Sequence, residues 1–243
     1  MPIKYSDSPS TVSYVYLDCI PEKKIFKGKV NLAALSTYGF YRNSIYDSYK
    51  EKPDLADDIK ARKKEFIEKD DSKSNDGLYK DPLYHYSVAA SLGAMQEWNN
   101  PSEKIHTYMA YEETEVGKRR IGFVHFNEKV VDGRPVVYIA QAGVQARGKG
   151  IGRHLMESVL SHYPAGTEFY ILTRVFNSDA KGLYEKRLGF SPIKEAEIKE
   201  LGYDNRYCGF KHTTTIDEVD AIKARQRSLA DEPLVDKADL YPK

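Results

Sequence analysis

Cysteine is scarce in this sequence, and the scarcity excludes one class of protein. The 243 residues contain two cysteines, Cys19 and Cys208, which are too few for the disulfide framework of a small secreted domain. The N-terminus also lacks the charged and then apolar profile of a secretory signal. We therefore expect a reducing, cytoplasmic environment.

An excess of one charge and a long apolar run are missing as well. Lysine and arginine number 37, and aspartate and glutamate number 36, so no overall field draws the chain to nucleic acid or to an anionic membrane. No apolar stretch approaches the roughly 18 residues that a membrane-spanning helix needs. We expect neither nucleic acid nor membrane as a partner, so any affinity for an anion must be local. A monomer and a homodimer both remain open.

The first hundred residues indicate one strand and three helices. A β-branched and aromatic run at 11–20 predicts the strand. Apolar residues recur every three or four positions over 31–50, which predicts a helix, and a second helical pattern starts at Pro53. Residues 70–82 are polar and predict a loop, and a third helix is expected over 87–98. Most aromatic residues of this region are expected to pack against a sheet rather than to hold a ligand.

The pattern changes to strands beyond Pro101. Short runs of Val, Ile, Phe and Tyr at 105–112, 120–127 and 135–142 are separated by turn residues, which predicts an antiparallel meander. The remaining expected elements, in chain order, are an amphipathic helix from 151, a strand at 167–176, a helix at 179–188, two short strands at 190–193 and 207–212, and a helix at about 216–229 in a polar tail.

Three alternating glycines lie between the last strand of the meander and the following helix. Gly148, Gly150 and Gly152 let the backbone approach an anion closely, and the helix presents its positive end to that anion. The run Gly143 to Lys149 also has the spacing of a triphosphate-binding loop, but Gly150 replaces the Ser or Thr that would hold magnesium. A dinucleotide fingerprint fits still less, because the glycine spacing differs.

Two motifs together resemble the GCN5-related N-acetyltransferase (GNAT) family. Arg147-Gly148-Lys149-Gly150-Ile151-Gly152 resembles its R/Q-x-x-G-x-G/A turn, and the segment from Asn177 to Phe190 resembles its later N-x-x-A-x-x-L-Y-x-x-x-G-F motif. The resemblance covers about residues 100–212 and extends more weakly to the strand near 11 and the helices from 31. It implies an α/β fold: a mixed, mainly antiparallel sheet flanked by helices, with a splayed parallel strand pair at the donor site.

The resemblance also implies a domain organisation and a function. One acetyltransferase domain would occupy 1–212, with an extended helical part at 21–99, and a polar, partly helical tail would follow at 213–243. The implied reaction moves an acetyl group from acetyl-coenzyme A (acetyl-CoA) directly to a primary amine of a small molecule or protein, without a metal. The alternative is a regulatory module that binds acyl-CoA without turnover.

Particular residues receive roles from the resemblance. Tyr184 falls where the family often has the acid that protonates the departing thiolate, and one extra residue before Gly189 predicts either a bulge in that helix or a rotated Tyr184. The implied donor-binding residues are Ala142, Gly143, Val144, Arg147, Gly148, Lys149, Gly150, Ile151, Gly152, Arg153 and Asn177.

The base that the resemblance implies has no direct match in this sequence. Many relatives have a glutamate on the strand before the glycine turn, whereas this strand offers Gln141, which cannot accept a proton at neutral pH. Neighbouring strands offer Glu112, Glu113, His125 and Glu128. We assign His125, because the reference pKa of histidine is near 6.5, and keep ordered water as the alternative.

Overall fold

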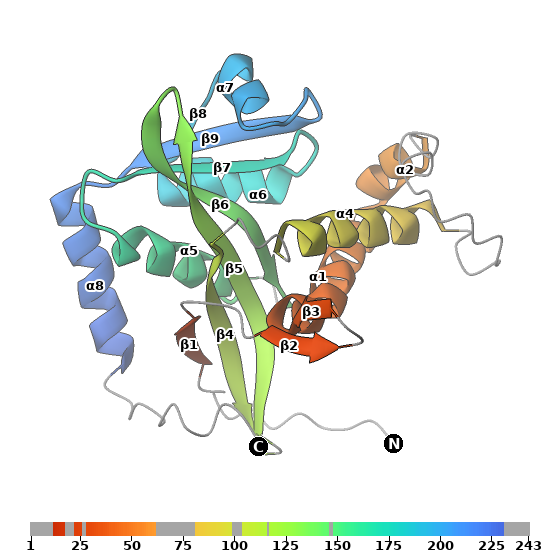
Figure 1. Ribbon diagram of the computed structural model, residues 1–243, viewed down its shortest axis with the longest axis horizontal. Coiled ribbons are helices and arrows are strands. Elements are labelled where there is room, and N and C mark those ends of the chain that lie inside the picture. The colour runs from red at the N-terminus through yellow and green to blue at the C-terminus, as the bar shows by residue number, and fades with distance from the viewer. Residues whose placement is uncertain are drawn as a thin grey trace.

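A seven-stranded sheet is the central element of the computed structural model (Figure 1), which describes residues 12–17, 22–25, 28–61, 81–98, 104–115, 117–145 and 148–230. Its strands, in spatial order, are β1 (Val12–Leu17), β4 (His106–Thr114), β5 (Gly117–Val131), β6 (Arg134–Val144), β7 (Glu168–Arg174), β9 (Tyr207–Thr213) and β8 (Ser191–Pro192). Neighbouring strands are antiparallel except β6 and β7, which are parallel. The expected fold class and the expected meander of β4, β5 and β6 are both confirmed.

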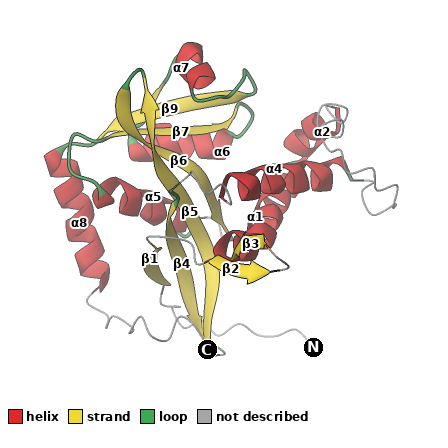
Figure 2. Cartoon of the chain, viewed as in Figure 1, coloured by secondary structure: helices red, strands yellow, loops and turns green. Residues whose placement is uncertain are grey.

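Helices cover the sheet from both sides (Figure 2). The described helices are α1 (Leu32–Lys50), α2 (Pro53–Ala61), α4 (Pro82–Trp98), α5 (Ile151–His162), α6 (Ser178–Gly182), the π-helical turn η2 (Leu183–Arg187), α7 (Glu195–Glu200) and α8 (Ile216–Ala230). In this view α5 and α8 lie on one side of strands β4 to β6, and α1, α2 and α4 lie on the other.

Alternation along the strands separates two buried clusters, one on each face of the sheet. On the α5 face, Phe126, Ile139, Phe169 and Phe210 pack with the apolar side of α5. On the opposite face, Tyr138 and other buried residues pack beside the segment around α7. Because successive strand residues point to opposite faces, the same strands supply both clusters.

Three elements differ from the sequence-based expectation. Helix α4 begins at Pro82 rather than near residue 87, because the Asp81 carboxylate accepts a hydrogen bond from the Leu83 amide at 2.9 Å and caps the helix, while proline suits its first position. A hairpin of β2 (Glu22–Ile25) and β3 (Gly28–Asn31) precedes α1 in the part expected to be helical. The short helix α7 was also not predicted. Residues 62–80, with most of the expected polar loop, lie outside the described residues.

Helix α8 packs on the outer side of α5 and joins the main core. Ile222 is 1% exposed and belongs to the same buried cluster as Leu155 and Val159 of α5. The helix expected in the C-terminal tail is therefore present, and it buries apolar side chains against the sheet domain. In the described ranges, no helix combines the length and the apolar character that crossing a membrane requires.

The packing of α8 predicts a stability difference within one helix. Replacing Ile222 with alanine should lower the free energy of unfolding by about 3 kcal/mol, because it leaves a cavity in the core. Ile216, on the same helix, is 69% exposed, so Ile216→Ala should change that free energy by less than about 0.5 kcal/mol. Urea unfolding followed by circular dichroism measures both values. Equal values for the two variants would contradict the docking of α8.

Candidate functional site

Strands β6 and β7 pair along only part of their length. Residues Val137–Ile139 pair with Phe169–Ile171, and at the next residue, Ala140, β6 carries a bulge against β5: His125 pairs with Gln141 and Phe126 with Ile139. A bulge bends the strand that contains it. Beyond Ala140, β6 continues beside β5 to Val144 but has no described pairing with β7. Apart from the Val144 carbonyl, which accepts a hydrogen bond from the Ser44 hydroxyl, the main-chain groups on the β7 side of this stretch have no main-chain partner among the described residues.

The glycine-rich turn follows immediately after this unpaired stretch. Gly148 and Gly150 have φ angles of +76° and +74°, the left-handed region that favours glycine. Gly150 is the N-cap residue of α5, and no side chain caps the helix. In the described part of the chain, no carbonyl accepts a hydrogen bond from the amides of Gly148, Lys149 or Gly150. A turn with these features at a helix N-terminus suits an anion.

The other predicted donor residues lie around the turn or just before it. Ala142 is exposed and Gly143 is buried, and a Cβ at Gly143 would lie 2.9 Å from the Phe123 ring, so packing alone requires glycine there. A Cβ at Gly152 would lie at ordinary van der Waals distance, 3.7 Å, from the Val144 side chain, so packing does not require glycine at that position. Arg147 lies outside the described residues.

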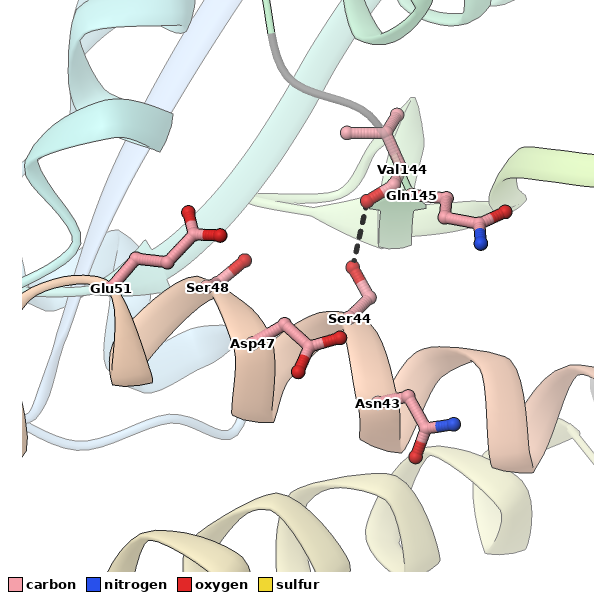
Figure 3. A pocket seen from close by; sticks show the side chains of 7 residues that line it. All are labelled: Asn43, Ser44, Asp47, Ser48, Glu51, Val144 and Gln145. Carbon is pink, nitrogen blue, oxygen red and sulfur yellow. Dashed lines mark hydrogen bonds between the residues drawn. The ribbon is translucent and has the colours of Figure 1, made fainter. Parts of the chain in front are cut away.

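A polar pocket of about 300 Å³ lies between α1 and the end of β6 (Figure 3). The Ser44 hydroxyl donates a hydrogen bond to the Val144 carbonyl at 3.0 Å and joins the helix to the strand. Ser48 and Glu51 lie farther along the same side of α1, as Figure 3 shows. Among the described residues, the pocket is lined by Asn43, Ser44, Asp47, Ser48, Glu51, Val144 and Gln145. Two of these lining residues are carboxylates and none is basic, so this described part of the lining suits a cation or a hydrogen-bond donor.

Tyr184 lies in the π-helical turn η2 and belongs to the main buried cluster with the apolar residues of α5. The π geometry accommodates one extra residue, and the Phe190 amide donates to the Tyr184 carbonyl at 2.9 Å. The predicted bulge is thus confirmed. The ring is 7% exposed and packs against Phe190 and Phe210. Burial, with Cys208 nearby, raises the pKa of Tyr184 above its ordinary value, so the phenol keeps its proton at neutral pH.

Asn177 caps helix α6. Its side-chain oxygen accepts from the Ala180 amide at 3.3 Å, and its side-chain nitrogen donates to the Thr173 hydroxyl at 3.1 Å. The Asn177 side chain therefore fixes the junction of β7 and α6. Lys52, just after α1, forms an ion pair with Asp179 of α6 at 2.5 Å, which ties the two sides of the site together.

His125 occupies a buried position in the sheet. It is 0% exposed, its Nδ1 lies 2.6 Å from the Thr107 hydroxyl, and its ring contacts Phe123. Burial, with Arg120 as a smaller cause, lowers the pKa of His125 from 6.5 to about 3. A neutral imidazole of this kind is a weak proton acceptor at neutral pH. It also does not line the pocket beside α1.

The acidic alternatives on neighbouring strands are engaged elsewhere or point to solvent. Glu112 pairs with Arg119, and Glu113 lies 3.5 Å from Lys118. Glu128 is exposed. The pocket carboxylates of α1 were not singled out from the sequence, because polar residues on one side of an amphipathic helix are equally typical of a solvated face.

Comparisons with known proteins gave a family match and several similar solved structures. A model of the acetyltransferase (GNAT) family matches residues 65–190, more than half of the chain. Solved structures similar to the chain include Naa50 of Arabidopsis thaliana in complex with the bisubstrate analogue CoA-Ac-MVNAL, at 28% identity over 44% of this chain and 72% of that chain, with a TM-score of 0.33. AtaTR bound with AcCoA is 17% identical over 50% of this chain and 72% of that one, with a TM-score of 0.34. A comparison with curated proteins gave no match.

The burial of His125 predicts how stability depends on pH. The pKa of about 3 in the folded state lies below the 6.5 of the unfolded chain, so the unfolded state takes up the proton first as the pH falls. The contribution of His125 to the free energy of unfolding is therefore complete above pH 6.5, the pKa in the unfolded chain. It decreases by about 1.4 kcal/mol per pH unit as the pH falls toward the pKa of the folded state. Between about pH 6 and pH 4, the wild type should lose about 2 kcal/mol more than His125→Gln.

Urea unfolding of both proteins across this pH range measures the difference, and every other titrating group serves as an internal control because both proteins share it. Parallel pH profiles would show that His125 titrates normally, and would restore it as a candidate base.

Proposed function

This chain belongs to the GNAT acetyltransferase family, and from that premise we propose that it transfers an acetyl group from acetyl-CoA to a primary amine of a small molecule or protein by direct attack. The observation that carries the proposal is the turn at 148–152, whose left-handed glycines and open amides follow directly after the unpaired end of β6. An anion-binding turn and an edge for an extended chain are what a phosphopantetheine donor needs.

The donor would lie along the unpaired part of β6. Its diphosphate would accept hydrogen bonds from the amides of Gly148 to Gly152, with the N-terminal end of α5 adding favourable electrostatics. The pantetheine arm would pair with main-chain groups of Gln141 to Val144. Because Ser44 already occupies the Val144 carbonyl, we expect the arm to use other main-chain groups there. The side chains of Lys149 and Arg153 would add positive charge beside the phosphates.

The acceptor amine would approach from the α1 side. Glu51 and Asp47 give the pocket a negative lining, which supports a protonated amine as the entering group. Since His125 is buried and neutral, we propose that water takes the ammonium proton before attack on the thioester. Glu51 would hold the amine in position through a charge-assisted hydrogen bond.

Direct attack requires a leaving thiolate and no enzyme-bound acyl group. Tyr184 would donate its phenolic proton to the departing thiolate of coenzyme A. Cys208, a half-buried cysteine beside this position, has a pKa raised by burial, so its thiol stays protonated and is a poor nucleophile. The alternative is a module that binds acyl-CoA without turnover, which would need no base such as His125. Release of coenzyme A in the presence of amines would distinguish an acetyltransferase from such a module.

Donor binding should depend on the left-handed glycine of the turn. Gly148→Ala places a side chain at a positive φ, which costs about 1–2 kcal/mol of backbone strain and tilts the amides away from the diphosphate. We expect acetyl-CoA affinity, measured by isothermal titration, to fall at least about tenfold, which corresponds to roughly 1.4 kcal/mol.

Gly202→Ala is the matched control, because Gly202 also has a positive φ, +86°, with open space around it, but follows α7. It should lose similar stability and keep full donor affinity. Wild-type protein that does not bind acetyl-CoA at high micromolar concentration would remove the donor assignment.

Two variants should separate the acid from the acceptor contact in steady-state assays of coenzyme A release. Tyr184→Phe should lower kcat about 100-fold at unchanged donor affinity, because the thiolate leaves without a proton. Glu51→Gln should raise KM for a cationic amine about tenfold, because a charge-assisted hydrogen bond becomes a neutral one.

Asp57→Asn on α2 is the control for charge, since Asp57 is exposed and pairs with Lys60 outside the pocket; its KM should not change. Full kcat in Tyr184→Phe would exclude the phenol as acid, and an unchanged KM in Glu51→Gln would exclude the α1 contact.

A further inference from the structure

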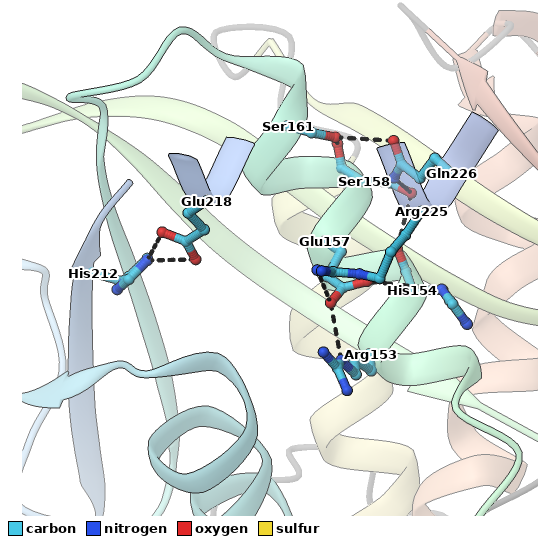
Figure 4. A network of polar contacts seen from close by, with 9 residues as sticks. All are labelled: Arg153, His154, Glu157, Ser158, Ser161, His212, Glu218, Arg225 and Gln226. Carbon is cyan, nitrogen blue, oxygen red and sulfur yellow. Dashed lines mark hydrogen bonds and ion pairs between the residues drawn. The ribbon is translucent and has the colours of Figure 1, made fainter. Parts of the chain in front are cut away.

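A buried carboxylate on α5 binds two arginines from different helices (Figure 4). Glu157 is 3% exposed. Its Oε1 atom accepts from Arg153 Nε of α5 and from Arg225 Nη2 of α8, both at 2.9 Å. A carboxylate this deeply buried needs such partners, because an ionised group without compensation is costly in the interior. Glu157 therefore fixes the positions of both guanidinium groups.

These arginines lie close to the glycine turn. Arg153 is the residue after Gly152 and belongs to the first turn of α5. The neighbouring His154 lies against the turn, since a Cβ on Gly150 would be 3.7 Å from its ring, and its Nδ1 is 3.8 Å from Glu157 Oε2. The His154 amide also donates a hydrogen bond to the Gly150 carbonyl at 3.0 Å, so His154 joins the turn to the Glu157 and Arg225 pair.

Both arginines remain accessible. The side chains of Arg153 and Arg225 are each 46% exposed, while that of Glu157 is 4% exposed. A guanidinium group has five N–H donors in one plane, and the bond to Glu157 occupies a single donor on Arg153. The cluster thus buries its carboxylate and keeps both guanidinium groups partly exposed beside the first two turns of α5.

Helix α8 is held in place by contacts that do not involve Arg225. Gln226 donates to the Ser158 hydroxyl at 3.2 Å, and His212 of β9 contacts Glu218 at 2.8 Å. Val219 and Ile222 are buried. These contacts keep the backbone of α8 fixed, so the position of Arg225 is set by the fold.

We propose that Arg225 of α8, together with Arg153, binds the 3′-phosphate of the donor's adenosine, so that the C-terminal helix forms part of the donor site. The inference rests on the proposed function, in which the diphosphate occupies the amides of the turn. The remaining anion of coenzyme A is then the 3′-phosphate, and paired guanidinium groups suit a phosphate through parallel charge-assisted hydrogen bonds. Glu157 acts as a positioning residue that orients both groups.

The test compares acetyl-CoA with 3′-dephospho-acetyl-CoA by isothermal titration. Wild-type protein should bind acetyl-CoA at least about tenfold more tightly than the dephospho compound, because a charged hydrogen bond to phosphate is lost. Arg225→Ala should weaken acetyl-CoA binding by about tenfold or more and change the affinity for the dephospho compound less than about twofold. Glu157→Gln should also reduce the ratio between the affinities for acetyl-CoA and for the dephospho compound.

Lys223→Ala removes an equal charge from the same helix and is the matched control; both affinities should stay at wild-type values. Equal wild-type affinity for the two compounds would overturn the inference while the proposed function stands. A similar loss of both affinities in Arg225→Ala would also overturn it, because it would indicate a structural role for Arg225. Failure of the wild type to bind either compound would overturn the proposed function and this inference with it.

Discussion

The bulge at Ala140 is the feature on which the rest of the site depends, because it ends the pairing of β6 with β7 within one residue. An unbroken parallel pair would use the main-chain groups that the two strands direct toward each other, and no extended ligand could be added between them. The bend leaves Gln141 to Val144 paired on one side only. The glycine turn at 148–152, for which we propose anion binding, lies a few residues further along the chain.

Elements far apart in the sequence are brought to this surface by packing. Helix α1 contacts β6 through Ser44 and carries Glu51 to one side. The π-helical turn η2 places Tyr184 inside the main core. Helix α8 brings Arg225 to the first turns of α5 through Glu157. In each case, packing between elements fixes the position of a polar group.

Local patterns in the sequence predicted the features that depend on local chemistry. Alternating glycines indicated the turn, and the extra residue before Gly189 indicated the irregularity of η2, because both depend on spacing along the chain. The bond between Glu157 and Arg225 joins positions 68 residues apart, and no spacing rule connects them. The burial of His125 likewise depends on which face of β5 meets the core. The predicted start of helix α4, near residue 87, lies after the observed start at Pro82, because Asp81-Pro82 is typical both of the end of a loop and of the start of a helix.

Hydrogen exchange at the turn tests the central claim most directly. We propose that the amides of residues 148–152 bind the donor's diphosphate and that main-chain groups at the unpaired end of β6 bind its pantetheine arm. Addition of acetyl-CoA should therefore slow exchange in peptides covering 141–152, measured by mass spectrometry, while exchange in the β4–β5 hairpin tip stays unchanged. Unchanged exchange in 141–152 at saturating acetyl-CoA would contradict the account.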